Sequence, residues 1–258
     1  AALMLVLKAE VAGQIRDVRF REGRIVEIGK QLFPEPGDDI FEARSGALIP
    51  GLHDHHLHLY ALAAALASVN CGPPDCASET SLQDSLRSAV PDRGWIRGTG
   101  YFESVAGPLD RHRLDQIRSD VPVRIQHRSG VMWFLNSRAI KELSLDAVDD
   151  PSLPPETLNP LDPQPIERDS SGRATGRLFR ADRWLRDRLP QRGAPDLAPV
   201  GQLLARYGVT AVTDATPTNT SEEFQLFHEA QVSGALPQQV RMMGGLSACS
   251  SPEQATPA

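Results

Sequence analysis

The histidines of this chain are concentrated in one short segment. Four of the seven lie within six residues, in the run IPGLHDHHLHL that extends from Ile49 to Leu59. His56 and His58 are two residues apart, so their imidazoles project from the same face of an extended backbone. Neutral imidazole is a good ligand for zinc and related divalent cations, and such a face can offer two nitrogens to one ion. The spacing therefore predicts that His56 and His58 are metal ligands.

Residues beside the two histidines have types that support such a site. Asp54 lies on the same alternating face and could orient a ligand through a hydrogen bond of its own. Pro50 and Gly51 precede it, and a glycine lets the backbone pass close to neighbouring elements. The pattern H-x-H also occurs by chance, so a histidine-rich surface turn that binds no metal is the alternative interpretation.

Two further residues are weaker candidates for the same site. His127 and Asp214 each fall near the C-terminal end of a predicted strand, where the active sites of barrel enzymes gather. The alternative for His127 is a structural histidine, and the alternative for Asp214 is the N-cap of the next helix. Tyr101, Trp133 and Trp184 could shape a substrate pocket, although aromatic residues at such spacings are more often core.

From Pro50 onward, segments typical of strands alternate with segments typical of helices. The predicted strands cover residues 95–101, 121–127, 209–214 and 239–243, and the predicted helices include 59–69, 109–118, 199–207 and 222–232. Alternation of this kind predicts an α/β fold with a parallel sheet or barrel. Residues 166–179 have instead the pattern of a β-hairpin.

The first fifty residues have a different pattern. Residues 3–8 form an apolar run, and residues 15–20 and 24–28 alternate between apolar and polar side chains around a turn. Such segments predict short strands of a small sheet with one apolar face, which another layer must cover. We therefore expect a β-layer over residues 1–50 that is separate from the α/β part.

Charge and composition exclude several classes of function. The chain has 258 residues, with 27 Lys and Arg against 33 Asp and Glu, which gives a net charge of −6. This mildly acidic balance argues against nucleic acid or an anionic membrane as the main partner. The apolar opening of the chain meets Lys8 too early for a membrane helix of about 20 residues, and no signal peptide is expected.

The three cysteines, Cys71, Cys76 and Cys249, have no spacing typical of a disulfide framework. We therefore expect a reducing, cytoplasmic location. Cys71 and Cys76 belong to the run CGPPDC and are predicted to be free thiols around a proline-rich turn. A clipped loop or a metal site is the alternative for this pair.

The segment ALIPGLHDHHLHL resembles the first-strand motif of the amidohydrolase superfamily, P-G-x-x-D-x-H-x-H. The motif is matched at Pro50, Gly51, Asp54, His56 and His58. The resemblance implies a divalent-metal site, with zinc as the metal and manganese or iron as alternatives, in which His56 and His58 are ligands. It also implies an α/β fold that contains part of a (β/α)8 TIM barrel and a small N-terminal β-sandwich.

Later segments narrow the resemblance to the amidohydrolase 3 branch, which contains formamide deformylase-like proteins. RIQHRSGVMWFLNSRAIKEL is similar to the third-strand segment of the branch, RDSSGRATGRLF to its hairpin insert, and LLARYGVTAVTDA to the helix and strand that follow. The likeness extends to about residue 245. It implies a β-sandwich-like part over 1–50 and an N-terminal part of the barrel over 51–245 with a hairpin insert near 166–179. The polar composition of residues 246–258 predicts a disordered tail.

The resemblance also implies a reaction. The branch hydrolyses carbon–nitrogen bonds other than peptide bonds, such as those of N-acyl or N-formyl amides, with water activated by the metal. The remaining ligands and the proton shuttle of the family come from later strands, which are expected beyond these residues. In addition, Val131 stands where the branch often has a histidine. From the reaction of the branch, we expect the whole protein to hydrolyse a small-molecule amide. The alternative is a catalytically incomplete fragment that needs a second chain or a homo-oligomer, or has no activity.

Overall fold

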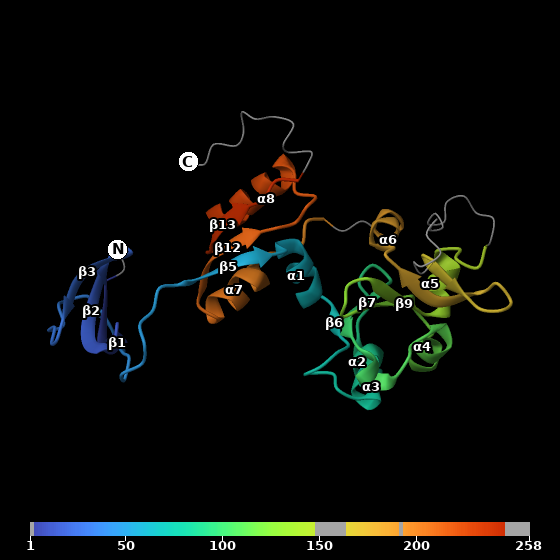
Figure 1. Cartoon of the computed structure of the whole chain (residues 1–258), viewed down its shortest axis with the longest axis horizontal. Coiled ribbons are helices and arrows are strands. Elements are labelled where there is room, and N and C mark those ends of the chain that lie inside the picture. The colour runs from blue at the N-terminus through green and yellow to red at the C-terminus, as the bar shows by residue number, and fades with distance from the viewer. Residues whose placement is uncertain (1–2, 148–163, 191–192, 246–258) are drawn as a thin grey trace.

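The computed structural model describes residues 3–147, 164–190 and 193–245 (Figure 1). These residues form three separate sheets, of four, three and six strands, which follow one another in that order along the long axis of the molecule. Helices and strands are mixed along the chain, which confirms the expected α/β class. The predicted tail at 246–258 lies outside the described residues. No helix of the described ranges is long and apolar enough to cross a membrane.

The N-terminal sheet consists of β1 (Leu3–Val11), β2 (Gln14–Arg21), β3 (Arg24–Gly29) and β4 (Asp39–Glu42), in the order β3-β2-β1-β4. Two-residue turns join β1 to β2 and β2 to β3. All four turn residues have positive φ: 49° at Ala12, 80° at Gly13, 50° at Glu22 and 73° at Gly23. Positive φ at both central positions is the requirement of type I′ hairpins, whose twist matches that of the strands they join.

A row of apolar side chains crosses one face of this sheet. Phe41, Val6, Val18 and Ile28 pair across neighbouring strands, so they share that face. The two central valines are buried, whereas Phe41 is 60% exposed and Ile28 is 53% exposed. The resemblance implies a β-sandwich here, but residues 3–42 form a single sheet, and the outer members of the row remain exposed to solvent.

The three-stranded sheet is built from parallel strands that are distant in sequence. β5 (Leu52–Leu57), β12 (Val209–Asp214) and β13 (Gln239–Met242) lie in the order β5-β12-β13. The helices of this part are α1 (Leu59–Leu66), α7 (Ala198–Arg206) and α8 (Ser221–Val232). They share one apolar core with the sheet, which includes Leu59, Val200, Leu204, Val212 and Phe227. Because α8 connects the parallel strands β12 and β13, this part contains a βαβ unit.

The six-stranded sheet and its helices are inserted in the sequence between α1 and α7, and we call this part the inserted unit. Its strands lie in the order β10-β11-β9-β8-β7-β6. They are β6 (Val69–Asn70), β7 (Ile96–Tyr101), β8 (Val123–His127), β9 (Met132–Leu135), β10 (Ile166–Arg168) and β11 (Ala174–Phe179). Its helices are α2 (Glu79–Ser88), α3 (Glu103–Ala106), α4 (Arg111–Ile117), α5 (Ser137–Glu142) and α6 (Asp182–Arg188). β6, β7 and β8 are parallel, whereas the pairs that involve β9, β10 and β11 are antiparallel.

This insertion differs from the expectation based on sequence. The sequence predicts that the strands at 95–101 and 121–127 continue the parallel sheet that begins with β5, but β7 and β8 belong to the other sheet. The hairpin expected near 166–179 is present as β10 and β11, and it extends that same sheet. Apolar periodicity is the same in both sheets, so it indicates each strand without indicating which strands pair.

The aromatic residues proposed as pocket walls are mainly core residues. Tyr101 is fully buried and meets the ring of Phe134 edge to face, with 5.3 Å between the ring centroids. Trp133 is buried in a second core cluster of the inserted unit, against which the partly buried Trp184 packs. The core interpretation therefore holds for Tyr101 and Trp133.

Cys71 and Cys76 are free thiols, as the sequence predicts, and both are buried in the inserted unit. Burial, and after it the neighbouring Cys76, raises the pKa of Cys71 to about 12. Because the thiolate is the reactive form, we expect Cys71 to resist iodoacetamide at pH 8 in the folded chain and to react when denaturant is added. Peptide mapping by mass spectrometry measures this, and rapid labelling of Cys71 without denaturant would contradict it.

Candidate metal centre

His56 and His58 lie where β5 gives way to α1. His56 belongs to β5, and His58 is the N-cap residue of α1, with an extended backbone (φ −119°, ψ 91°). Between Asp54 and Leu57 the register of β5 against β12 shifts, so that three steps along β5 match two along β12. This extra residue is a β-bulge, which bends a strand and changes the direction of its side chains. The bulge therefore contributes to where the imidazole of His56 points.

The two imidazole rings have a separation and an angle that suit a shared ion. Their centroids are 5.3 Å apart and their planes are inclined by 80°. A zinc–nitrogen bond is about 2.0–2.1 Å long and the ring centre lies about 1.2 Å beyond the nitrogen, so two imidazoles at a tetrahedral angle have centroids about 5.2 Å apart. The observed spacing fits two imidazoles on one tetrahedral ion.

The ring of His58 is held by a residue from the loop after β12. Nδ1 of His58 lies 3.1 Å from Oγ1 of Thr216. When Nδ1 carries the proton and donates it to this oxygen, Nε2 carries the lone pair and can bind a metal. His58 is half-buried at this position, whereas His56 is exposed. While this contact with Thr216 is kept, Nε2 is the ring nitrogen of His58 that is left for a ligand.

Asp54 contacts the main chain of a histidine and not a ring. Its Oδ1 accepts a hydrogen bond from the backbone N–H of His56, with a distance of 3.0 Å. Short polar side chains commonly satisfy a nearby backbone group in this way where a regular ladder is interrupted. The supporting role that the sequence suggests for Asp54 thus corresponds here to a contact that stabilises the bulged backbone.

Asp214, the last residue of β12, is buried and accepts three hydrogen bonds. Its Oδ2 accepts from the backbone N–H of Leu59 (2.7 Å), and its Oδ1 accepts from Thr216 N (2.9 Å) and Asn219 Nδ2 (2.8 Å). Burial raises the pKa of this carboxyl, but the bonds from Leu59, Asn219 and Thr216 outweigh burial and hold the pKa below its usual range. Asp214 therefore anchors the start of α1. The expected alternative, a cap for the next helix, is wrong because Thr220 caps α8.

His127 lies in the inserted unit, and His56 and His58 do not. It ends β8 in the inserted unit, whereas His56 and His58 lie at the end of β5. Its Nδ1 is 2.7 Å from Oγ of Ser129, and its Nε2 is 3.2 Å from Oε2 of Glu103. Both ring nitrogens have partners within the inserted unit, which agrees with a structural histidine.

The remaining histidines of the motif have a geometry unlike that of His56 and His58. The rings of His53 and His55 have centroids 3.9 Å apart and planes inclined by 31°. This spacing is shorter than the roughly 5.2 Å that two imidazoles on one tetrahedral ion require. His53 is also engaged through Nε2, which lies 2.9 Å from Oγ1 of Thr213. Of the two pairs, His56 and His58 have the ring separation that one tetrahedral ion would need.

The described residues contribute only part of a coordination sphere. Within them, no group of three or more His, Cys, Asp and Glu side chains is arranged to hold a metal ion. His56 and His58 would thus provide two ligands of a four-coordinate site, and water or residues outside the described ranges would provide the others. The sequence did not indicate Thr216, because a threonine two residues after a strand-terminal aspartate is too common to stand out.

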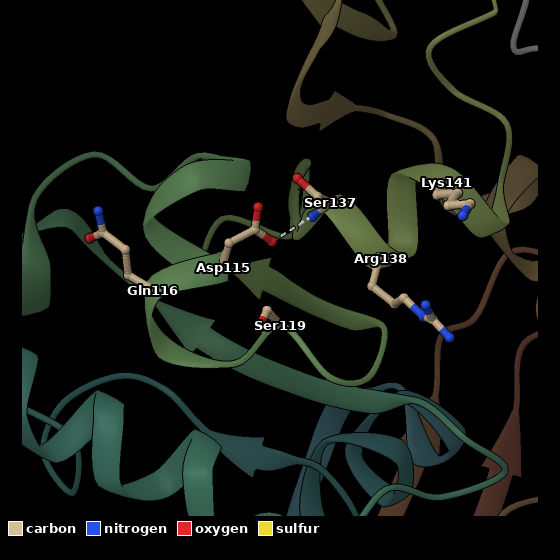
Figure 2. Close-up of a pocket in the computed structure, with 6 residues that line it drawn as sticks. All are labelled: Asp115, Gln116, Ser119, Ser137, Arg138 and Lys141. Carbon is tan, nitrogen blue, oxygen red and sulfur yellow. Dashed lines mark hydrogen bonds between the residues drawn. The ribbon is translucent and has the colours of Figure 1, made fainter.

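A hollow of about 470 Å³ lies elsewhere, between α4 and α5 of the inserted unit (Figure 2). Its lining residues are polar or charged: Asp115, Gln116, Ser119, Ser137, Arg138 and Lys141. Asp115 is engaged within it, because its carboxylate accepts a hydrogen bond from Ser137 N (2.9 Å). The hollow is lined from helices and contains no histidine, whereas the sites of parallel α/β folds lie at the carboxyl ends of strands. The end of β5 is therefore the better candidate for chemistry.

The sequence and the structure of this chain are similar to those of known proteins. The sequence matches the amidohydrolase family over residues 39–257. N-substituted formamide deformylase of Arthrobacter pascens is 26% identical over 243 residues, which cover 86% of this chain and 43% of that enzyme. Two solved structures, uncharacterized metal-dependent hydrolases from Pyrococcus horikoshii OT3 and Pyrococcus furiosus, each match 94% of this chain with a TM-score of 0.59 and 16% identity.

The match covers 48% of the first of these structures and 50% of the second, so the chain spans about half the length of the relatives it matches. At this level of identity the structural likeness establishes a shared fold. The family match itself extends over most of the chain and includes both histidines at the end of β5. This chain therefore belongs to the amidohydrolase family.

Proposed function

We propose that the protein to which this chain belongs is a metal-dependent hydrolase of carbon–nitrogen bonds other than peptide bonds. The observation that carries the proposal is the pair of imidazoles of His56 and His58, 5.3 Å apart at the carboxyl end of a parallel strand. Membership of the amidohydrolase family and the likeness to metal-dependent hydrolases support it.

In this function His56 and His58 bind one divalent cation, for which zinc is the proposed metal and manganese or iron the alternatives. A bound cation would lower the pKa of a water molecule and polarise a substrate carbonyl. Asp54 holds the backbone of His56, and Thr216 holds the ring of His58. We do not assign Asp214 the role of transferring a proton, because its two oxygens already accept hydrogen bonds from three N–H groups.

We propose further that β5, β12 and β13 are three consecutive strands of a (β/α)8 barrel. They are adjacent and parallel, and α7 and α8 precede the second and third of them. The histidines then lie at the carboxyl end of the first strand, where such barrels place their active sites. Further strands would pair with the outer edges of β5 and β13, and a second sheet over the row from Phe41 to Ile28 would complete a β-sandwich.

The proposed substrates are small N-acyl or N-formyl amides. Support comes from the likeness to an N-substituted formamide deformylase. The test is an assay of formate release from an N-substituted formamide by a longer protein that carries this chain and its continuation. We expect turnover that is lost on chelation, restored by Zn²⁺ and abolished by His56→Ala, because that imidazole is one of the metal ligands. Metal-independent turnover, or full activity in His56→Ala, would overturn the proposal.

The alternative is that this chain works only when a second chain or a second copy of itself completes the site. The outer edges of β5 and β13 favour it, since each of these strands has one neighbour within the described sheet and an open edge can pair with another chain. In this case the 258-residue chain would show turnover with added zinc only in a dimeric fraction. Size-exclusion chromatography with light scattering, followed by assay of each fraction, separates this outcome from an inactive monomer.

A further inference from the structure

We propose that Thr216 is a positioning residue that fixes the ring of His58 with Nδ1 toward its hydroxyl and Nε2 toward the metal. The inference rests on the proposed function, because it assigns a role to Thr216 at the same metal site. It concerns a residue on a different strand connection, 158 positions away in the sequence. Thr216 is not itself a ligand in this assignment.

The hydrogen bond between the two residues is anchored on both sides by one carboxylate. Nδ1 of His58 and Oγ1 of Thr216 are 3.1 Å apart. Asp214 accepts a hydrogen bond from Leu59 N, the residue after His58, and another from the backbone N–H of Thr216. Asp214 is 0% exposed, so the carboxylate that accepts these bonds is itself shielded from water. The backbone on each side of the bond is therefore held to the same buried group.

This arrangement leaves one tautomer of the histidine able to bind a metal. A neutral imidazole has one N–H and one lone pair, and the hydrogen bond that one nitrogen makes decides which nitrogen is left for a metal. If Nδ1–H donates to Oγ1 of Thr216, the lone pair is on Nε2. Metal-binding histidines are commonly fixed by such a contact of the second nitrogen, and loss of the contact weakens metal binding by about 10- to 100-fold.

Strand β12, which precedes Thr216, offers a matched control. Thr213 is three residues earlier, and its Oγ1 lies 2.9 Å from Nε2 of His53. This is also a threonine–histidine contact, but His53 belongs to the closely spaced pair with His55 and not to the pair proposed to bind metal. Replacement of the threonine should therefore lower metal affinity strongly at Thr216 and little at Thr213.

The experiment compares Thr216→Val, Thr216→Ser and Thr213→Val with the unchanged chain. Imidazole nitrogen NMR without metal identifies the protonated nitrogen of His58, and titration with Co²⁺ followed by absorption measures metal affinity. We expect Nδ1–H in the unchanged chain and in Thr216→Ser. In Thr216→Val we expect a shift toward the Nε2–H tautomer and an affinity about 10- to 100-fold lower. Thr213→Val should leave the tautomer of His58 and the affinity for Co²⁺ unchanged.

Two outcomes would overturn the role of Thr216. One is an Nε2–H tautomer of His58 in the unchanged chain, and the other is a Thr216→Val variant with the same tautomer and the same cobalt affinity. Failure of the proposed function gives a different result: cobalt would not bind, or would bind equally after His56 and His58 are both replaced. The tautomer measurement needs no metal, so it still decides the role of Thr216 in that case.

Discussion

Replacement of both His56 and His58 by alanine is expected to remove specific divalent-metal binding by this chain, with a loss of affinity for Zn²⁺ of at least about 100-fold. The two imidazoles have the spacing of ligands on one tetrahedral ion. Within the described ranges, no larger cluster of ligand side chains would take over their role. Isothermal titration with Zn²⁺, or competition against a chromogenic chelator, measures the difference.

The control for this prediction is the double variant His53→Ala, His55→Ala. It removes the same number of imidazoles from the same segment of the chain, but from the pair whose ring centroids are 3.9 Å apart. We expect this control to keep the affinity of the unchanged chain to within about 3-fold. Equal losses in both double variants would contradict the assignment, because the metal would then depend on the total number of histidines and not on the geometry of one pair.

The absolute affinity of the unchanged chain provides a second check. Two protein ligands satisfy half of a four-coordinate zinc ion, and water must occupy the other positions. We therefore expect a dissociation constant in the micromolar range or weaker. Stoichiometric binding with a submicromolar constant that depends on His56 and His58 would show that further ligands join them.

The part of the site that is local in sequence could be predicted, because its geometry depends on short-range rules. The motif around His56 and His58 indicates a strand that leads into a helix, and the structure has β5 followed directly by α1. The close approach expected at Gly51 is also present, since a Cβ atom there would lie 2.2 Å from Oγ1 of Thr210. Only a residue without a side chain fits this contact without rearrangement.

The long-range part could not be predicted in the same way. Asp214 reaches Leu59 across 155 positions and Thr216 reaches His58 across 158, and no spacing rule connects such pairs. The separate sheet of the inserted unit could not be predicted for a related reason. Its strands β7 and β8 have the apolar pattern of strands in any buried parallel sheet, and their membership of a second sheet depends on pairing partners. The bulge in β5 likewise depends on the register against β12.

Replacement of Asp214 by asparagine is expected to lower the free energy of unfolding by about 3 kcal/mol. Three N–H donors converge on this buried carboxylate, from Leu59, Thr216 and Asn219. Asparagine has one carbonyl oxygen, and its NH₂ group can only donate. If its oxygen accepts from Leu59, its NH₂ group faces the other two donors, and the reverse orientation leaves the amide of Leu59 without an acceptor. At least one buried donor is unsatisfied in either case.

Asp110→Asn is the matched control for this change. Asp110 caps α4 by accepting a hydrogen bond from the backbone N–H of Arg113 (2.9 Å), and asparagine is as good a helix cap as aspartate, so its cost should stay below about 0.5 kcal/mol. Urea unfolding measures both variants, and hydrogen exchange at the Leu59 amide reports the local loss. Because folding lowers the pKa of Asp214 from 3.8, its stabilisation is present above that pH and is lost as the pH falls through the folded-state pKa. Asp214→Asn should lack this acid-dependent loss, and a variant as stable as Asp110→Asn would show that Asp214 does not anchor the start of α1.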